Sequence, residues 1–251
     1  MMILPNSRDT IHKAWLYRLL SAIYDNKTLA SSLYFKGGTC AAMLGFLDRF
    51  SVDLDFDYTG EKEKIKMLKK ELENIFSELG LEIKDQSQKV PQYFLKYQAK
   101  INLRNTIKID ITFPAPKANT YQAFKLDDID RTIVCQTAET MFANKLVALI
   151  DRWERKKAIA GRDLYDIHYF FMQGLGYNEK VIIERRKNSD LAYFFRTLIN
   201  FIDKKINETI IDQDLNFLLS PDKFKKIRKM LKKETMMFLK DEEEMLKKNY
   251  I

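Results

Sequence analysis

The stretch that decides the fold of this chain is Lys36-Gly-Gly-Thr39, followed closely by Ser51-Val-Asp-Leu-Asp-Phe56. A glycine pair lets the backbone approach a phosphate more closely than residues with a Cβ atom allow. The second stretch places two carboxylates one residue apart, which on a strand puts them on the same face. Together the two stretches predict a site for a nucleoside triphosphate and its metal ions.

Residues 52–58 alternate between apolar and acidic side chains, as a half-buried strand does. Carboxylates two residues apart on a strand, roughly 6.5–7 Å at Cα, can converge on metal ions. Two-metal sites hold their ions roughly 3.5–4 Å apart, and Mg²⁺ prefers oxygen ligands. We therefore predict Asp53 and Asp55 as metal ligands, and we expect Asp57, farther along the same face, to be exposed to solvent.

A third carboxylate, Asp110, lies in a second alternating run at 107–113. An aspartate within a β-branched strand is unfavourable for strand propensity and needs a reason. One reason is a role as third metal ligand, from which Asp110 could also act as the base toward an attacking hydroxyl. The alternative is an edge strand on which Asp110 faces water.

The composition of the 251 residues, with 46% apolar and 31% charged residues, is typical of a globular protein. No run of 18 apolar residues predicts a membrane span, and Met1–Pro5 is too short for a secretory signal. We expect a cytoplasmic protein without membrane attachment. The net charge of +8 favours polyanionic partners, although a lysine-rich composition explains it equally well.

The pattern along the chain changes from mixed α/β to helical near residue 130. We therefore predict an α+β fold with a domain at 1–130, a mixed β-sheet flanked by helices, and a helical domain at 131–251. No flexible linker marks the boundary. Helices are expected at 8–25, 61–79, 138–157, 163–172, 179–204 and 223–247, and strands at 33–35, 52–58, 92–98 and 107–113.

The helix predicted at 138–157 carries Lys145 away from its apolar stripe, and a lysine ammonium is a compact charge suited to a triphosphate. Asp163 and Asp166 open the next helix, where aspartates also serve as ordinary caps. The aromatic residues that follow show helical spacing, so we expect them in the core rather than on a base-stacking surface. Six basic residues form a positive patch here: Lys145, Arg152, Arg155, Lys156, Lys157 and Arg162.

The glycine turn, the Asp-x-Asp strand and the later apolar-Asp-apolar strand resemble the nucleotidyltransferase pattern. A closer resemblance is to the AbiEii toxins of type IV toxin–antitoxin systems. It rests on Phe35–Thr39, Arg49–Phe56, Lys145–Leu149 and Gly161-Arg-Asp-Leu-Tyr-Asp-Ile167, and covers about residues 33–170.

The resemblance implies transfer of a nucleoside monophosphate from an NTP to the 3′ end of tRNA, with Mg²⁺ or Mn²⁺ and a cognate antitoxin possible. Asp53, Asp55 and Asp110 would hold the metal, and Lys145 and Asp163 would join them in catalysis. Ser51 could be a phosphorylation target, but we favour an ordinary residue at a strand entry. The residues expected to bind the nucleotide are Lys36, Gly37, Gly38, Thr39, Ser51 and Lys145.

Two other functions are compatible with the same motifs. The chain could nucleotidylate a small molecule or a protein hydroxyl, or it could bind a nucleotide without turnover. Labelled nucleotide on RNA or on protein separates the enzymatic alternatives, and pyrophosphate release excludes the binding module.

Overall fold

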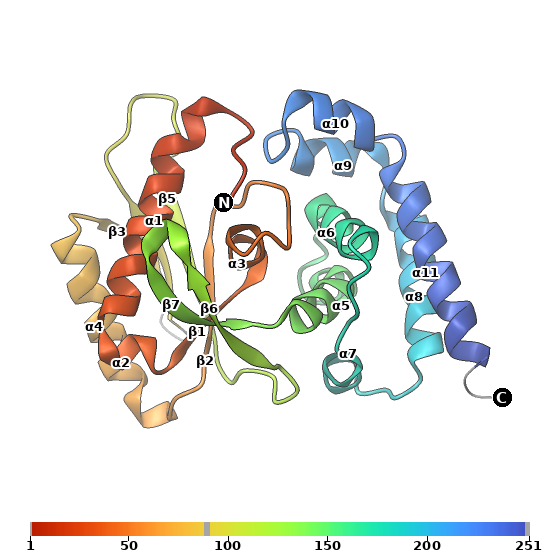
Figure 1. The fold of residues 1–251 in the computed structure, drawn as a ribbon, viewed down its shortest axis with the longest axis horizontal. Coiled ribbons are helices and arrows are strands. Elements are labelled where there is room, and N and C mark those ends of the chain that lie inside the picture. The colour runs from red at the N-terminus through yellow and green to blue at the C-terminus, as the bar shows by residue number, and fades with distance from the viewer. Residues whose placement is uncertain (1, 88–90, 249–251) are drawn as a thin grey trace. The chain divides into compact units, whose positions relative to one another are not determined.

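A computed structural model describes residues 2–87 and 91–248 (Figure 1). The chain forms two compact units. The sheet unit contains the residues up to Ala115 and Thr120–Thr137. The helical unit contains Pro116–Asn119 and the residues from Ala138 onward.

The sheet unit is built on a mixed seven-stranded sheet of order β3-β4-β5-β2-β1-β7-β6. The pairs β2–β5 and β1–β7 are parallel, and all other neighbours are antiparallel. The strands that carry the sequence motifs, β1, β2 and β5, are therefore interior and adjacent. Their bounds are β1 Leu33–Lys36, β2 Leu54–Tyr58, β3 Glu82–Gln86, β4 Gln92–Lys96, β5 Thr106–Thr112, β6 Tyr121–Leu126 and β7 Arg131–Gln136.

One side of these central strands is apolar, as the alternation predicts. Phe35 and Phe56 are fully buried with ring centroids 5.4 Å apart, and Ile109 and Ile111 continue this layer on β5. Burying this side leaves the opposite, polar side of β1, β2 and β5 for the functional side chains. The helices of the unit are α1 Thr10–Asp25, α2 Lys27–Ala30, α3 Gly37–Met43 and α4 Ile65–Glu78, with 3₁₀ turns at Ser7–Asp9, Lys62–Lys64 and Asp127–Ile129.

The helical unit has an aromatic core in which Phe142 of α5 stacks on Phe170 of α6, with ring centroids 5.1 Å apart. Gly161 lets α6 approach α9, because a Cβ atom there would lie 2.7 Å from the carbonyl oxygen of Ile210. The helices are α5 Ala138–Lys156, α6 Gly161–Met172, α7 Glu179–Arg186, α8 Leu191–Lys205, α9 Glu208–Leu215, α10 Pro221–Ile227 and α11 Leu231–Lys248.

The predicted α+β class, with a mixed sheet and a helical region, is confirmed. The helix expected at 179–204 is instead two helices, because Lys187 adopts φ +53° and Asp190 caps a new helix by accepting from the Tyr193 N–H. Likewise, the helix expected at 223–247 divides into α10 and α11. Across residues 2–87 and 91–248, no helix has the length and apolarity needed to cross a membrane.

Candidate active site

The turn after β1 lies directly against the aspartate strand. Gly37 has φ +78°, and a Cβ atom at this residue would lie 2.6 Å from Oδ2 of Asp55. At Gly38 a Cβ atom would lie 2.8 Å from Nη2 of Arg49 and 3.0 Å from Oγ of Ser51. Both glycines are therefore required by close approach, and the turn brings Ser51 and Asp55 next to its backbone.

Thr39 links the same turn to the start of the aspartate strand. Its side chain is fully buried, and its hydroxyl donates to the backbone carbonyl oxygen of Asp53. This hydrogen bond fixes the chain just before β2. Thr39 therefore lies in the turn predicted to bind phosphate, with its hydroxyl hydrogen-bonded to the Asp53 backbone.

Three carboxylates come together where β2 begins: Asp55 on β2, Asp110 on β5, and Asp53 just before β2. Asp55 and Asp110 are register partners on the parallel strands, and Asp53 precedes Asp55 by two residues. Burial, followed by the negative charges of Asp53 and Asp110, raises the pKa of Asp55 to about 6, although nearby lysines oppose the shift. The carboxylates therefore repel one another, and a divalent cation would relieve this repulsion.

The chemistry of these donors fits Mg²⁺, which takes carboxylate oxygens as ligands. Their arrangement is not a finished coordination site. Asp110 pairs with Lys108 and accepts a hydrogen bond of 3.0 Å from Gln92 Nε2. Both of these contacts use Oδ2 of Asp110. In the described part of the chain, no three His, Cys, Asp or Glu side chains converge as ligands for one ion.

Asp57 is fully buried, so the expectation that it faces solvent was wrong. It accepts hydrogen bonds from Lys36 Nζ at 2.6 Å, Tyr121 Oη at 2.8 Å and Gln136 Nε2 at 2.7 Å. Alternation identifies the face on which Asp57 lies, but it does not reveal what covers that face. The cover comes from β6 and β7, two strands that the sequence analysis did not predict.

Lys36 lies between the acidic side chains of β2. It is the register partner of Asp55 across the antiparallel pair, and it donates to Asp57 and, at 2.6 Å, to Thr112 Oγ1. Its side chain is 18% exposed. An ammonium group has three donors, and two are used here, so a third N–H is left for the predicted contact with a nucleotide.

In the helical unit, Lys145 forms the centre of a buried charge cluster. Its Nζ lies 2.9 Å from Asp163 Oδ1 and 2.8 Å from Asp166 Oδ2, and Arg152 Nη2 lies 3.1 Å from Asp163 Oδ2. Burial alone raises the pKa of Asp163, but Lys145 and Arg152 outweigh it and hold that pKa well below its ordinary value. Ala160, without a side-chain cap, is the N-cap of α6, so both aspartates are ion-pair partners rather than N-caps.

The fold agrees with known nucleotidyltransferase structures. An H. pylori protein assigned as a nucleotidyltransferase shares 20% identity at a TM-score of 0.62, covering 97% of this chain and 98% of that one. JHP933 from Helicobacter pylori shares 20% identity at 0.61, covering 99% and 97%. The nucleotidyltransferase toxin MenT4 from Mycobacterium tuberculosis shares 17% identity at 0.54, covering 95% and 87%.

The sequence itself matches one protein family over almost its whole length. No curated protein sequence matches significantly. Residues 18–247 match the family described as nucleotidyl transferase AbiEii toxin, type IV toxin–antitoxin system. The match includes the glycine turn, all three carboxylates of the sheet and the Lys145 cluster. The chain therefore belongs to the AbiEii nucleotidyltransferase toxin family, and it is a transferase.

Proposed function

We propose that this nucleotidyltransferase moves a nucleoside monophosphate from an NTP to the 3′-terminal hydroxyl of tRNA and thereby inhibits growth as a toxin. The observation that carries the proposal is the contact between the Gly37 turn and Asp55, with Asp53 and Asp110 beside it. A turn that admits phosphate next to clustered carboxylates suits metal-assisted transfer of a phosphoryl group.

Asp53 and Asp55 would hold Mg²⁺ or Mn²⁺, and Asp110 would complete the site. The metal would neutralise charge on the triphosphate and polarise it. A carboxylate oxygen of Asp110 would accept the proton of the attacking hydroxyl. The hydroxyl oxygen then bonds to the α-phosphorus as the bond to the pyrophosphate oxygen breaks. Pyrophosphate carries away the displaced negative charge.

Phosphate binding is assigned to the turn and its neighbours. Lys36, Gly37, Gly38 and Ser51 supply an ammonium group, backbone and a hydroxyl at one place, and Thr39 holds the turn against Asp53. Lys145 and Asp163 keep the nucleotide-binding and catalytic roles implied by their sequence motif. The support for those two roles is the family membership, because their charges satisfy one another in the helical unit.

The second part of the proposal is the acceptor. The net charge of +8 favours a polyanion such as RNA. The sequence motifs suit transfer to a small molecule or to a protein hydroxyl equally well. A cognate antitoxin encoded beside the gene is expected from the type IV family.

One incubation separates these alternatives. The protein is mixed with Mg²⁺, total tRNA and each α-labelled NTP in turn, with Asp55→Asn as the inactive control. We expect label on tRNA-sized RNA with one or two of the four nucleotides, and its loss after periodate oxidation of the tRNA 3′ end. Label on protein alone would move the acceptor elsewhere. Absence of pyrophosphate release would reduce the function to nucleotide binding.

A further inference from the structure

The segment from Lys223 to Lys233 in the helical unit is strongly basic and includes most of α10, the turn after it and the first residues of α11. We call it the cationic segment. Between Pro221 and Lys233 the only acid is Asp222. The cations of the segment are Lys223, Lys225, Lys226, Arg228, Lys229, Lys232 and Lys233.

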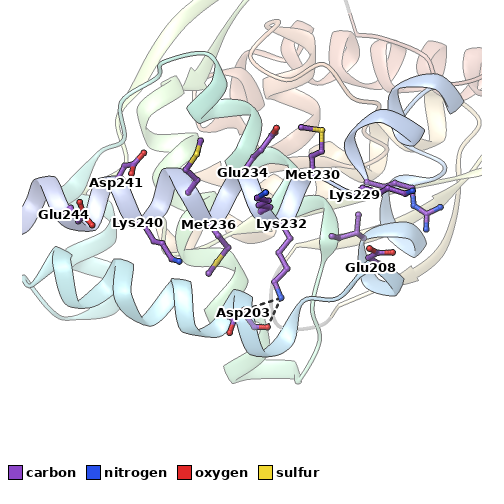
Figure 2. A pocket seen from close by; sticks show the side chains of 14 residues that line it. Asp203, Glu208, Lys229, Met230, Lys232, Glu234, Met236, Lys240, Asp241 and Glu244 are labelled. Atoms are coloured by element: carbon purple, nitrogen blue, oxygen red, sulfur yellow. Dashed lines mark hydrogen bonds and ion pairs between the residues drawn. The ribbon is translucent and has the colours of Figure 1, made fainter.

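Internal ion pairs neutralise only part of this charge. Arg228 pairs with Asp212, and Lys232 lies 3.8 Å from Asp203, a contact drawn in Figure 2. Lys225, Lys226, Lys229 and Lys233 are exposed. A positive surface therefore remains after the structural pairs are satisfied, which is the usual footprint of a phosphate-bearing partner.

A pocket with aromatic walls adjoins the cationic segment. Tyr165 and Tyr169 of α6 stack with ring centroids 6.3 Å apart, and Lys223 Nζ lies 5.8 Å and 5.6 Å from the two centroids. Tyr165 is buried, but Tyr169 is partly exposed and lines the pocket with Lys226. Our expectation that these aromatic residues belong to the core holds for Tyr165 and not for Tyr169.

The other walls of this pocket are unusually apolar for a surface. Met172 is 57% exposed and Met230 is 52% exposed, and Ile227, the last residue of α10, also lines the pocket. Methionine side chains adapt to ligands of different shape and contact aromatic rings favourably. The walls therefore suit a flat aromatic group, and the lysines of the segment suit an anion joined to it.

A second pocket adjoins the tyrosine pocket along α11 (Figure 2). It shares Met230 and Glu234 with the tyrosine pocket. Its other charged lining residues are of both signs: Arg228, Lys229, Lys232, Lys233 and Lys240, and Asp203, Glu208, Asp241 and Glu244. A free nucleotide needs contacts at one place only. Two adjoining pockets along a run of lysines instead match a chain that repeats a base and a phosphate at each step.

We propose that the cationic segment and Tyr169 bind unpaired nucleotides of an RNA strand. One base enters the pocket beside Tyr169 and Met172, and the flanking phosphates contact Lys226 and Lys229. Aromatic stacking distinguishes this partner from an acidic protein, for which a lysine surface alone would suffice. The proposal rests on the proposed function only in taking RNA as the polyanion.

Fluorescence anisotropy with a labelled single-stranded 12-nucleotide RNA and with labelled tRNA tests the binding directly. We expect Lys226→Glu/Lys229→Glu to weaken both affinities at least about tenfold and to lower the salt slope by about 1.4 for two lost phosphate contacts on the single strand. Tyr169→Leu should weaken single-strand binding roughly tenfold, and Tyr169→Phe should retain it. The matched charge control is Lys180→Glu/Lys248→Glu, whose residues are exposed in the same unit.

Circular dichroism and thermal melting confirm that each variant is folded. Equal losses in the control pair, or an unchanged affinity in Lys226→Glu/Lys229→Glu, would overturn the proposal. A loss confined to Arg155→Ala/Lys156→Ala/Lys157→Ala would place the RNA on a different surface. Pyrophosphate release with tRNA is measured separately. If pyrophosphate is released but this surface does not bind RNA, the RNA-binding inference is wrong and the proposed function stands. If this surface binds RNA but no pyrophosphate is released, the proposed function is wrong and the RNA-binding inference stands.

Discussion

Lys36 Nζ and Asp57 Oδ1 lie 2.6 Å apart, and the carboxylate of Asp57 is completely inaccessible to solvent. The pair links β1 to β2, and Asp57 lies two residues after Asp55 on β2. Tyr121 and Gln136 supply two further hydrogen bonds to the same carboxylate. A buried charge is tolerated only when its partners are complete, so the position of Lys36 depends on this network.

Removing either partner should destabilise the protein strongly. We expect Lys36→Ala and Asp57→Ala each to lower the free energy of unfolding by about 3–5 kcal/mol, because each leaves an unpaired buried charge. The double variant Lys36→Ala/Asp57→Ala should lose less than the sum of the single changes. Urea unfolding followed by circular dichroism measures all three. Strictly additive losses would show that the two side chains are not coupled.

Gly37 and Gly45 offer a matched pair of glycine substitutions. Both have positive φ, +78° and +80°, but a Cβ atom meets Asp55 at Gly37 and nothing within 4 Å at Gly45. Gly45→Ala should cost only the left-handed strain of about 1–2 kcal/mol. Gly37→Ala should cost more and abolish nucleotide incorporation, because Asp55 must move. If the two variants have equal activity and stability, the contact between the turn and Asp55 is not required for activity.

The metal-binding proposal is tested by changing charge while keeping shape. Asp53→Asn and Asp55→Asn should each reduce nucleotide incorporation by at least about a hundredfold, since each removes an anionic ligand. Both variants should remain folded, because removing one negative charge relieves the repulsion among Asp53, Asp55 and Asp110 and offsets the contacts that the substituted carboxylate loses. Incorporation is measured over a Mg²⁺ and Mn²⁺ titration, with circular dichroism on the same samples. Full activity in either variant would remove that residue from the metal site.

Lys145 should be important for stability as well as for any catalytic role. Lys145→Ala leaves the buried carboxylates of Asp163 and Asp166 without their shared cation, which costs about 3–5 kcal/mol. From the sequence alone, Lys145 is expected to be a partly exposed lysine that contributes little to folding. Activity per folded molecule, measured below the melting temperature, separates the two roles. Normal specific activity in the folded fraction would make Lys145 purely structural.

His12 should make stability depend on pH. Burial lowers the pKa of His12 to about 4; its Nε2 donates to the Val52 carbonyl oxygen at 2.9 Å, and Nδ1 lies 2.7 Å from Tyr97 Oη. The unfolded chain takes up this proton near pH 6.5, so stability is lost as the pH falls from 6.5 to 4, by about 3 kcal/mol in total.

The His12 contribution is isolated by comparison with His12→Gln. Asp55 makes the protein more stable as the pH falls through about 6, because its pKa is raised to about 6 in the folded state. The difference between the two proteins removes that contribution. Urea unfolding at pH 7, 6, 5 and 4 should show a steeper loss of stability in the unchanged protein. Parallel curves would mean that His12 is accessible to protons in the folded state.

Sequence reasoning succeeded where a strand has one apolar side. Alternation located β2 and β5 and placed Asp55 and Asp110 on their polar side. It failed for β3, whose residues are all exposed, and for the edge strand β6, because neither alternates. β7 carried a usable signal in Thr132-Ile-Val-Cys135 that was not recognised. Tyr121 and Gln136 were therefore missing from the predicted site, and the burial of Asp57 could not be inferred.

The parallel pairing of β1 with β7 sets the order in which a ribosome can complete this sheet. Phe35 of β1 pairs with Cys135 of β7, so this pair cannot form until about a hundred more residues have been synthesised. Such distant pairings form late in folding. A nascent chain that stops before β7 already carries the glycine turn and all three sheet carboxylates. It lacks the strand that flanks Lys36 and the Gln136 amide that helps to satisfy Asp57, so we expect prematurely terminated toxin to be inert.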